Sequence, residues 1–183
     1  AAVRDAAPRQ AQAGRQVRDN VTVILTTSPI PSHPSAALLD HVLASLQLAG
    51  LDDCRCIIVC DGYVVGDKNR PKRGSVSEEV ALGYEEYIRV LQQRYASNGR
   101  TEVLQLKEHC GFGFAVRAAL DKVHTPFVCV IQHDNAFVRT VDLEPCLQAL
   151  GDPRVKYVGL VSSATTDYEA FCKSRYGITI SAL

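Results

Sequence analysis

The sequence contains no methionine and no tryptophan, and none of its apolar runs approaches the roughly 20 residues that a membrane-spanning helix requires. Because Met is missing even at position 1, we expect that Ala1 is not a native start and that the chain was cut from a longer protein. The start also lacks the apolar core of a signal peptide. The chain as given is therefore expected to be soluble, with no membrane contact. Its compartment stays open between the cytoplasm and, if a longer anchored protein contains it, a Golgi-type lumen.

An excess of one charge is also missing, because 20 basic and 20 acidic residues balance. A neutral chain gives no reason to expect binding to nucleic acid or to an anionic membrane. The length of 183 residues suits one domain with a substantial core. We expect that domain at residues 20–183. The preceding residues, 1–19, are rich in Ala, Arg and Gln, which predicts a flexible tail or linker remnant.

No CxxC pair occurs among the seven cysteines, so their spacing offers little support for a zinc site. In CRCIIVC, residues 54–60, every second side chain falls on one face of a strand, where cysteine behaves as a small apolar residue. Buried thiols are therefore favoured over metal ligands or disulfides.

The sequence does contain apolar runs that alternate with helical patterns. Unbroken apolar runs predict strands, and apolar residues at helical spacing predict the helices between them. The predicted strands are 21–25, 54–60, 101–107, 127–131 and 156–165, and the predicted helices are 36–50, 80–96, 111–123 and 141–153. Residues 64–77 between them are predicted to form a polar loop. Continuous apolar strands separated by helices are typical of an α/β fold, with a mostly parallel sheet and helices on both faces.

Polar side chains follow the predicted strands at the edge where parallel sheets bind ligands. Thr27 follows the first strand, Asp61 the second, and Gln132 to Asn135 the fourth. Gln132 and Asp134 share one face of their strand, since side chains alternate with a period of two. An amide beside a carboxylate suits a hard divalent ion that takes its other ligands from water and a diphosphate. Alternatively, Asp134 caps the following turn, and spacing alone favours neither interpretation.

Two common nucleotide-binding motifs are absent. There is no GxGxxG after the first strand and no GxxxxGK[ST] anywhere, which argues against an ordinary dinucleotide-binding domain and against a P-loop enzyme. The GFGF stretch at 111–114 is weak evidence for a phosphate-binding loop by itself.

In their order, these pieces resemble the nucleotide-binding half of a family 2-like glycosyltransferase with the GT-A fold. VTVILTTSP resembles the VSVIIPTYN of that family, and VCDGY at 59–63 resembles its VDDGS. GFGFAVRAALDKVHTPFVCVIQHDN aligns without a gap with GxxxARNxGxxxAxGxYIxFLDxDD, which places Gln132 and Asp134 in the two acidic positions of the DxD motif. The resemblance covers roughly residues 20–165.

The resemblance implies a Rossmann-like GT-A nucleotide-diphospho-sugar transferase fold with a nucleotide-sugar donor site. Thr27 would lie near the nucleoside, and Asp61 would accept a hydrogen bond from the base, expected to be uracil. Asp134 would hold Mg²⁺ or Mn²⁺ against the diphosphate while an acceptor hydroxyl attacks the sugar. His133 is a second candidate ligand, although such a histidine is more often a hydrogen-bonded or solvent-facing group.

The same alignment also covers the segment that begins at Gly111. In it, Gly111 and Arg117 are candidates for binding the nucleotide sugar. Arg117 would either contact phosphate or pair with Asp121 one helical turn further on.

The chain departs from the family pattern in two respects. Cys60 and Gln132 stand where the family has acidic residues, so metal binding is expected to be weaker. Inverting members usually supply a general base from far beyond the DxD motif, and the chain ends at residue 183. Asp167 and Glu169 are weak candidates for that base, with a surface loop as their expected place. We therefore expect that the domain is truncated at its C-terminus.

Three functions stay open on the sequence. The first is a glycosyltransferase domain acting on a nucleotide-sugar donor and an acceptor that the sequence does not identify. The second is a nucleotidyltransferase, although TTSPIPSHPS lacks the Gly-rich loop and basic residue that such enzymes usually carry after the first strand. The third is a non-catalytic GT-A-like binding domain, which the changes at Cys60 and Gln132 keep open.

Overall fold

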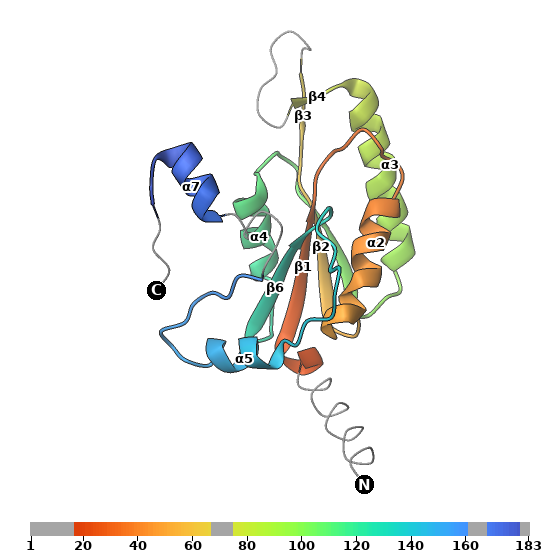
Figure 1. Ribbon diagram of the computed structural model, residues 1–183. Helices are drawn as coiled ribbons and strands as arrows, with labels where there is room; N and C mark the ends of the chain where they lie inside the picture. The colour runs from red at the N-terminus through yellow and green to blue at the C-terminus, as the bar shows by residue number, and fades with distance from the viewer. Residues whose placement is uncertain (1–16, 67–74, 161–167, 180–183) are drawn as a thin grey trace. The chain divides into compact units, whose positions relative to one another are not determined.

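A computed structural model describes residues 17–66, 75–160 and 168–179 (Figure 1). The chain forms two compact units, residues 1–144 and 145–183. The expectation of one domain over residues 20–183 stays a prediction. Of the predicted tail, only its last residues are described. They form a helical turn in which Val17 is buried and its carbonyl accepts from the Cys54 thiol.

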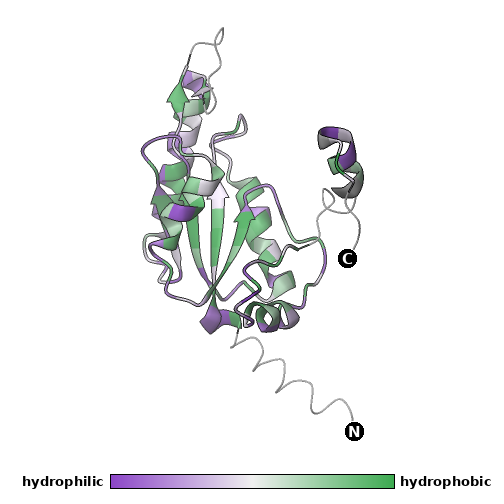
Figure 2. Cartoon of the chain, turned by 90° about the vertical axis from the view of Figure 1, so that its left-hand side faces the viewer, coloured by the Kyte–Doolittle hydropathy of each residue, from purple (hydrophilic) through white to green (hydrophobic). Residues whose placement is uncertain are grey.

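Four parallel strands form the central sheet of the first unit, in the order β5-β2-β1-β6. They are β1 (Val21–Thr27), β2 (Arg55–Cys60), β5 (Thr101–Gln105) and β6 (Phe127–Gln132). Leu25 of β1 is in register with Ile58 of β2 and Ile131 of β6. Every residue of β1 is buried, and the hydrophobic colouring runs along the central strands in Figure 2. An unbroken apolar run suits such a strand because helices cover both of its faces.

Helices lie on both faces of this sheet (Figure 1). They are α2 (Ala37–Ser45) with the 3-10 turn η1 (Leu46–Ala49), α3 (Glu78–Tyr95) and α4 (Phe112–Leu120). On one face, Ala115 and Ala119 of α4 pack in a buried cluster with Ile24, Ile57 and Val59 of the strands. On the other face, tyrosines of α3 reach the end of β1. The predicted α/β, Rossmann-like fold with a parallel sheet between two helical layers is confirmed.

Two of the helical elements have capping residues at their ends. Gly50 follows η1 with φ of 64°, a left-handed conformation that glycine adopts at low cost. Ser77 precedes α3, and its hydroxyl accepts from the Val80 amide.

The remaining elements are short. Within the predicted polar loop at 64–77, β3 (Val64–Val65) and β4 (Ser75–Val76) form a small parallel pair, while residues 67–74 lie outside the described residues. The second unit contains α5 (Glu144–Leu150), which starts at its boundary, and α7 (Tyr168–Tyr176).

One predicted element is wrong. A strand was predicted over residues 156–165, but residues 156–160 form no strand, and 161–165 lie outside the described residues. Tyr157 is 81% exposed, so the apolar character of this run does not correspond to burial. A strand requires a partner that accepts its hydrogen bonds, and composition does not reveal whether one is present.

The seven cysteines are free thiols, as the sequence favoured. Cys54, Cys56 and Cys60 are buried. Burial raises the pKa of Cys54 to about 11 and the pKa of both Cys56 and Cys60 to about 12. These thiols therefore stay protonated and act as small apolar residues. Among the described residues, no helix is long and apolar enough to cross a membrane.

Candidate functional site

The carboxyl ends of the strands bring together most of the polar residues that the sequence singled out. Because β1 lies between β2 and β6, Asp61 after β2 and Asp134 after β6 lie at the same edge of the sheet. Parallel strands are about 4.8 Å apart, so the strands that lead to these two carboxylates are separated by about 10 Å. The Asp61 amide donates to the Thr27 carbonyl and the His133 amide donates to the Thr26 carbonyl, both at 2.9 Å. These bonds fix the three strand ends relative to one another.

Asp61 is a buried carboxylate that binds the loop between β5 and α4. Its Oδ1 accepts from the amides of Gly62 and Cys110, both at 2.9 Å, and its Oδ2 accepts from the Gly111 amide at 3.0 Å. The Nδ1 of His109 lies 3.0 Å from Oδ2. Asp61 is only 5% exposed. Its two oxygens therefore already have protein donors, so in the described structure Asp61 anchors this loop. The predicted contact of Asp61 with a base stays a prediction.

Two glycines allow the same loop to approach the end of β2. A Cβ atom on Gly62 would overlap the backbone of Glu108, so only glycine fits there. Gly111 precedes α4 with φ of 77° and ψ of 167°, a conformation that is essentially restricted to glycine. Its carbonyl accepts from the Ala115 amide at 3.0 Å, which starts the helix. Gly111 is therefore a backbone element of the site.

Thr27 is packed beneath aromatic side chains. It is 2% exposed, and its hydroxyl lies 3.3 Å from the hydroxyl of Tyr87. The Tyr84 hydroxyl donates to the carbonyls of Thr27 and Asp61, at 3.3 and 3.0 Å. Burial raises the pKa of both Tyr84 and Tyr87, so both stay protonated hydrogen-bond donors. These contacts place the Thr27 side chain inside the core at the edge of the site.

The loop after β1 is held against the same tyrosines by His33. Its ring stacks on Tyr87 and Tyr84, with centroid distances of 4.1 and 5.1 Å. The Ile30 amide donates to its Nδ1 at 3.3 Å. Burial, together with the nearby His133, lowers the pKa of His33 to about 4. The imidazole is therefore neutral at pH 7 and acts as a packing group.

The end of β6 exposes the side chains that were predicted to bind the metal. Gln132 and Asp134 are exposed, and Asp134 Oδ1 accepts from the Asn135 side chain at 3.1 Å. His133 is partly buried, and burial lowers its pKa. In the described part of the chain, no group of three or more His, Cys, Asp or Glu side chains could hold a metal ion. These donors fit a hard cation that takes most of its ligands from a diphosphate and water, and they do not fit an ion held by protein groups alone.

Arg117 is exposed on α4, and it does not form the pair with Asp121 that was one of its two predicted contacts. No hydrogen bond or ion pair joins it to Asp121 in the described structure. Both side chains are exposed, and an exposed pair at this spacing gains only about 0.3–0.5 kcal/mol. The alternative, a contact between Arg117 and phosphate, stays a prediction.

The two candidates for the general base belong to the second unit. Asp167 lies outside the described residues. Glu169 lies in helix α7, and not in the surface loop that the sequence suggested. Neither is assigned a role.

A cavity of about 210 Å³ opens beside Asp61, between α3 and the ends of β2 and β5. Its lining comprises Asp61, Gly62, Tyr63, Tyr84, Glu85, Ile88, Gln105, Leu106 and Lys107. Sequence reasoning missed Tyr63, Glu85 and Lys107. Tyr63 directly follows the Asp61-Gly62 turn and could have been noticed, but Glu85 occupies an ordinary exposed position of a helix and carries no motif.

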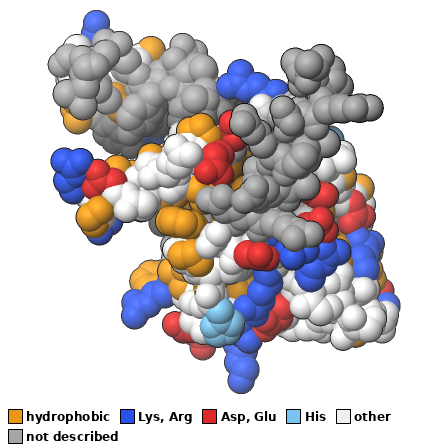
Figure 3. All heavy atoms as spheres, turned by 90° about the horizontal axis from the view of Figure 1, so that it is seen from below, with side chains coloured by type: hydrophobic (Ala, Val, Ile, Leu, Met, Phe, Trp, Pro, Cys, Tyr) orange, Lys and Arg blue, Asp and Glu red, His pale blue; other side chains and the backbone are white. Residues whose placement is uncertain are grey.

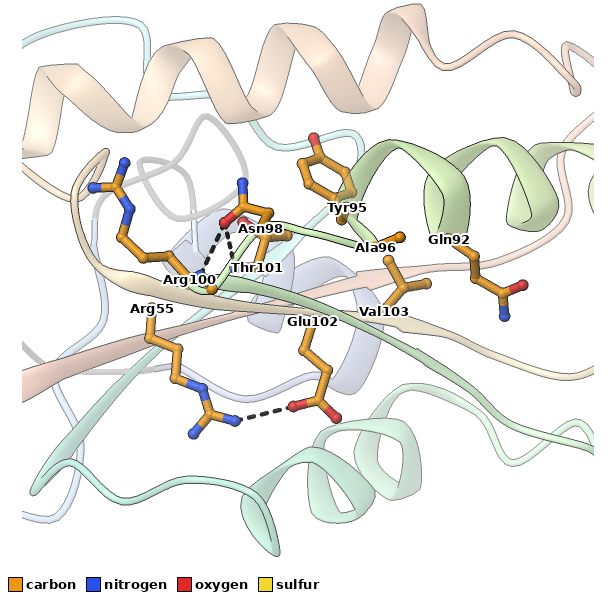
Figure 4. A pocket seen from close by; sticks show the side chains of 10 residues that line it. Arg55, Gln92, Tyr95, Ala96, Asn98, Arg100, Thr101, Glu102 and Val103 are labelled. Atoms are coloured by element: carbon orange, nitrogen blue, oxygen red, sulfur yellow. Dashed lines mark hydrogen bonds and ion pairs between the residues drawn. The ribbon is translucent and has the colours of Figure 1, made fainter.

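A second cavity, of about 390 Å³, lies at the opposite, amino-terminal end of β5 (Figure 4). Arg55 pairs with Glu102 at 3.0 Å, and Arg100 pairs with Asp53. Seen from below, basic and acidic side chains lie beside one another on this side of the molecule (Figure 3). The charges in this cavity are therefore compensated, and none of the predicted site residues lines it.

The sequence matches no family model and no curated protein. Among solved structures, the chain is similar to S. aureus TarS, residues 1–349, a GT-A-like glycosyltransferase. The match covers 79% of this chain and 39% of that chain, with 16% identity and a TM-score of 0.44. The chain therefore spans well under half of the TarS chain, and the likeness concerns part of the fold alone.

Proposed function

We propose that the chain is a glycosyltransferase domain that binds a nucleoside-diphosphate sugar, expected to be UDP-linked, at the carboxyl edge of its sheet. The observation that carries the proposal is the position of Asp61 and Asp134, which follow the two strands on either side of β1 at one edge. Ligands of open parallel sheets bind at this edge. The resemblance of VTVILTTSP, VCDGY and the segment from Gly111 to family 2-like glycosyltransferases supports the proposal from the sequence.

In this proposal, Asp134 and Gln132 hold a Mg²⁺ or Mn²⁺ ion against the diphosphate. When bound, the ion supplies Lewis-acid stabilisation of the nucleoside diphosphate as it leaves. Asp61 keeps the loop before α4 in position through its bonds to backbone amides. Arg117, exposed on α4, is available to a phosphate oxygen. The acceptor in this proposal is a hydroxyl compound.

A thermal-shift titration tests the proposal. We expect UDP with Mn²⁺ to raise the melting temperature of the chain, since a ligand that binds only the folded state stabilises it by mass action. Asp134→Ala should abolish the Mn²⁺-dependent part of this shift. Asp121→Ala is the matched control, because it removes an exposed carboxylate outside the strand ends and should leave the shift unchanged.

The other outcomes identify the alternative functions. A larger shift with nucleoside triphosphates than with UDP would favour a nucleotidyltransferase. If neither UDP, GDP, UDP-sugars nor triphosphates shift the melting temperature, the chain is a GT-A-like domain without nucleotide binding, and the proposal is wrong. An equal shift by UDP in the parent and in Asp134→Ala would remove Asp134 from the site.

A further inference from the structure

The sheet has an open edge at β5, and the cavity of about 390 Å³ lies along it. In the described structure β5 pairs with β2 alone. The Leu106 amide donates to the Cys60 carbonyl, so the even-numbered residues of β5 direct their backbone groups at β2 and the odd-numbered ones direct theirs outward. Val103 lines the cavity and is partly buried. Its N–H and C=O therefore face the cavity, and neither has a partner among the described residues.

Side chains close this edge on both sides of Val103. On one side, Asn98 Oδ1 accepts from the Thr101 amide at 3.0 Å. On the other side, Gln92 of α3 reaches over the edge, and its Nε2 donates to Gln105 Oε1 at 3.4 Å. A peptide that adds a strand to a sheet needs a longer run of free backbone groups than the gap between these side chains offers. The opening therefore suits a compact ligand better than an extended peptide.

The guanidinium groups that line the cavity are paired with carboxylates of the protein. Arg55 lies 3.0 Å from Glu102, which also accepts from Lys122 at 2.5 Å, and Arg100 pairs with Asp53. A phosphate or carboxylate ligand would have to compete with these carboxylates for the guanidinium groups. A neutral ligand that carries both donors and acceptors can bind without separating the ion pairs. The cavity therefore favours a neutral polar ligand.

On the side of β5 that faces α3, the cavity combines one aromatic ring with two side-chain amides (Figure 4). The ring is that of Tyr95, which is partly buried. Arg94, paired with Asp40, bonds to the Tyr95 hydroxyl, which holds the ring in place. Gln92 Oε1 and the Asn98 side-chain NH₂ have no partner in the described part of the chain, so they add an acceptor and a donor.

This set of groups complements a sugar ring. One face of a sugar is made of C–H groups, which can pack on an aromatic ring and cover apolar surface. Its hydroxyls each donate and accept, and neighbouring hydroxyls match an amide or a paired backbone N–H and C=O. The volume of about 390 Å³ lies in the lower part of the range of about 300–1,000 Å³ that is usual for small-molecule sites. A ligand of one or two rings is therefore expected.

We infer that the cavity at the β5 edge binds a neutral saccharide, with its ring on Tyr95 and its hydroxyls on Gln92, Asn98 and the backbone of Val103. The cavity lies at the amino-terminal end of β5, whereas the proposed donor site lies at the carboxyl edge of the sheet. The inference therefore goes beyond the proposed function and requires neither nucleotide nor metal. In a domain that transfers sugars, this cavity would hold a glycan part of the acceptor or product while the donor binds elsewhere.

Amide NMR titrations of the full chain test the inference. The probes are maltose, lactose, mannobiose and chitobiose at millimolar concentrations, without nucleotide or metal. We expect at least one of them to shift the signals of residues 95, 98, 101 and 103. Tyr95→Leu, which removes the ring but keeps an apolar side chain, should weaken binding about threefold to tenfold. Tyr95→Phe keeps the ring and should bind as the parent does.

A pair of neighbouring amides on α3 supplies the matched control. Gln92→Ala removes a hydrogen-bonding group of the cavity and should weaken binding about twofold to tenfold. Gln93→Ala removes an equally exposed amide that does not line the cavity, so it should leave binding unchanged. Circular dichroism of each variant checks that the fold is retained. Equal losses in both variants would contradict the assignment of the site.

Three other outcomes would overturn the inference. None of the four saccharides shifts the signals of the cavity, or inorganic phosphate shifts them and the saccharides do not, or the signals move with the concentration of the chain itself. The second outcome would indicate an anion site, and the third would indicate contact between copies through β5. Asp134→Ala should bind saccharide like the parent, so failure of the donor site and failure of the saccharide site are separate results.

Discussion

Asp61 is a buried carboxylate whose partners are mainly backbone amides of a loop distant in sequence. In Asp61→Asn, an amide NH₂ would replace one oxygen and face a donor, either a backbone N–H or His109. We expect this change to lower the free energy of unfolding by about 2 kcal/mol, since a hydrogen bond to a charged group contributes about 1.5–3 kcal/mol. Urea denaturation measures the change. Asp134→Asn, at an exposed carboxylate, should cost less than about 0.5 kcal/mol, and an equal loss in both variants would contradict the anchoring role.

Gly62 is the second residue on which this loop depends. Gly62→Ala would drive a Cβ atom into the backbone of Glu108, which cannot move aside as a flexible side chain can. We expect a loss of about 1–3 kcal/mol, the range typical of overpacking. Gly99→Ala is the control, because its Cβ would meet no atom within 4 Å. If Gly62→Ala and Gly99→Ala had the same denaturation midpoint, the loop would have moved without a loss in the free energy of unfolding, which would contradict this prediction.

The sequence placed Asp61 at the edge of the sheet because a polar residue ends an apolar strand there. It could not reveal that Cys110 and Gly111, 49 and 50 residues away, would occupy its oxygens with their backbone amides. Backbone N–H donors occur throughout a sequence, so the sequence does not show which of them will donate to Asp61. Glu85 and Lys107 were missed for a related reason, since each lies at an exposed position where charged residues are common and only the fold brings them to one cavity.

At the scale of elements, the start of α4 contains two glycines with opposite roles. Gly111→Ala should lower the free energy of unfolding by about 1–3 kcal/mol, because its φ of 77° and ψ of 167° are unfavourable for a residue with a Cβ atom. Gly113→Ala should raise it by about 0.5–1 kcal/mol, because alanine loses less conformational freedom inside a helix. A Cβ atom at either position would meet no atom within 4 Å, so packing does not obscure the comparison. Thermal denaturation of both variants should give shifts of opposite sign. Shifts of the same sign would contradict the backbone conformation described for Gly111.

Apolar runs were predictive of strands where a neighbouring strand shares their hydrogen bonds. The runs at 21–25 and 127–131 became buried or edge strands of the sheet, each extended by the polar residues that follow. The run at 156–165 has the same apolar character, yet its described part forms no strand. A strand depends on a neighbour that shares its hydrogen bonds, and that is a property of the fold rather than of the run.

At the scale of the whole molecule, the lowered pKa of His33 predicts how the free energy of unfolding depends on pH. Its pKa is lowered to about 4 in the folded chain from about 6.5, so folding favours the neutral imidazole. Its contribution to stability is complete above about pH 6.5 and is lost as the pH falls toward about 4. We expect the free energy of unfolding, measured with urea, to fall over this window. In His33→Phe, which keeps an aromatic ring against Tyr87, the free energy of unfolding should fall less steeply with pH. Part of the decline should persist because burial also lowers the pKa of His133. Identical slopes for parent and variant would contradict this role of His33.

The thiols of the chain differ sharply in accessibility. Cys54, Cys56, Cys60 and Cys172 are buried, Cys129 and Cys146 are partly buried, and Cys110 is exposed. Cys110 also contributes one of the amides that Asp61 binds. A thiol-reactive fluorophore would therefore attach preferentially at the loop beside the candidate donor site, so the unmodified sequence already provides a labelling position from which ligand arrival can be followed by fluorescence.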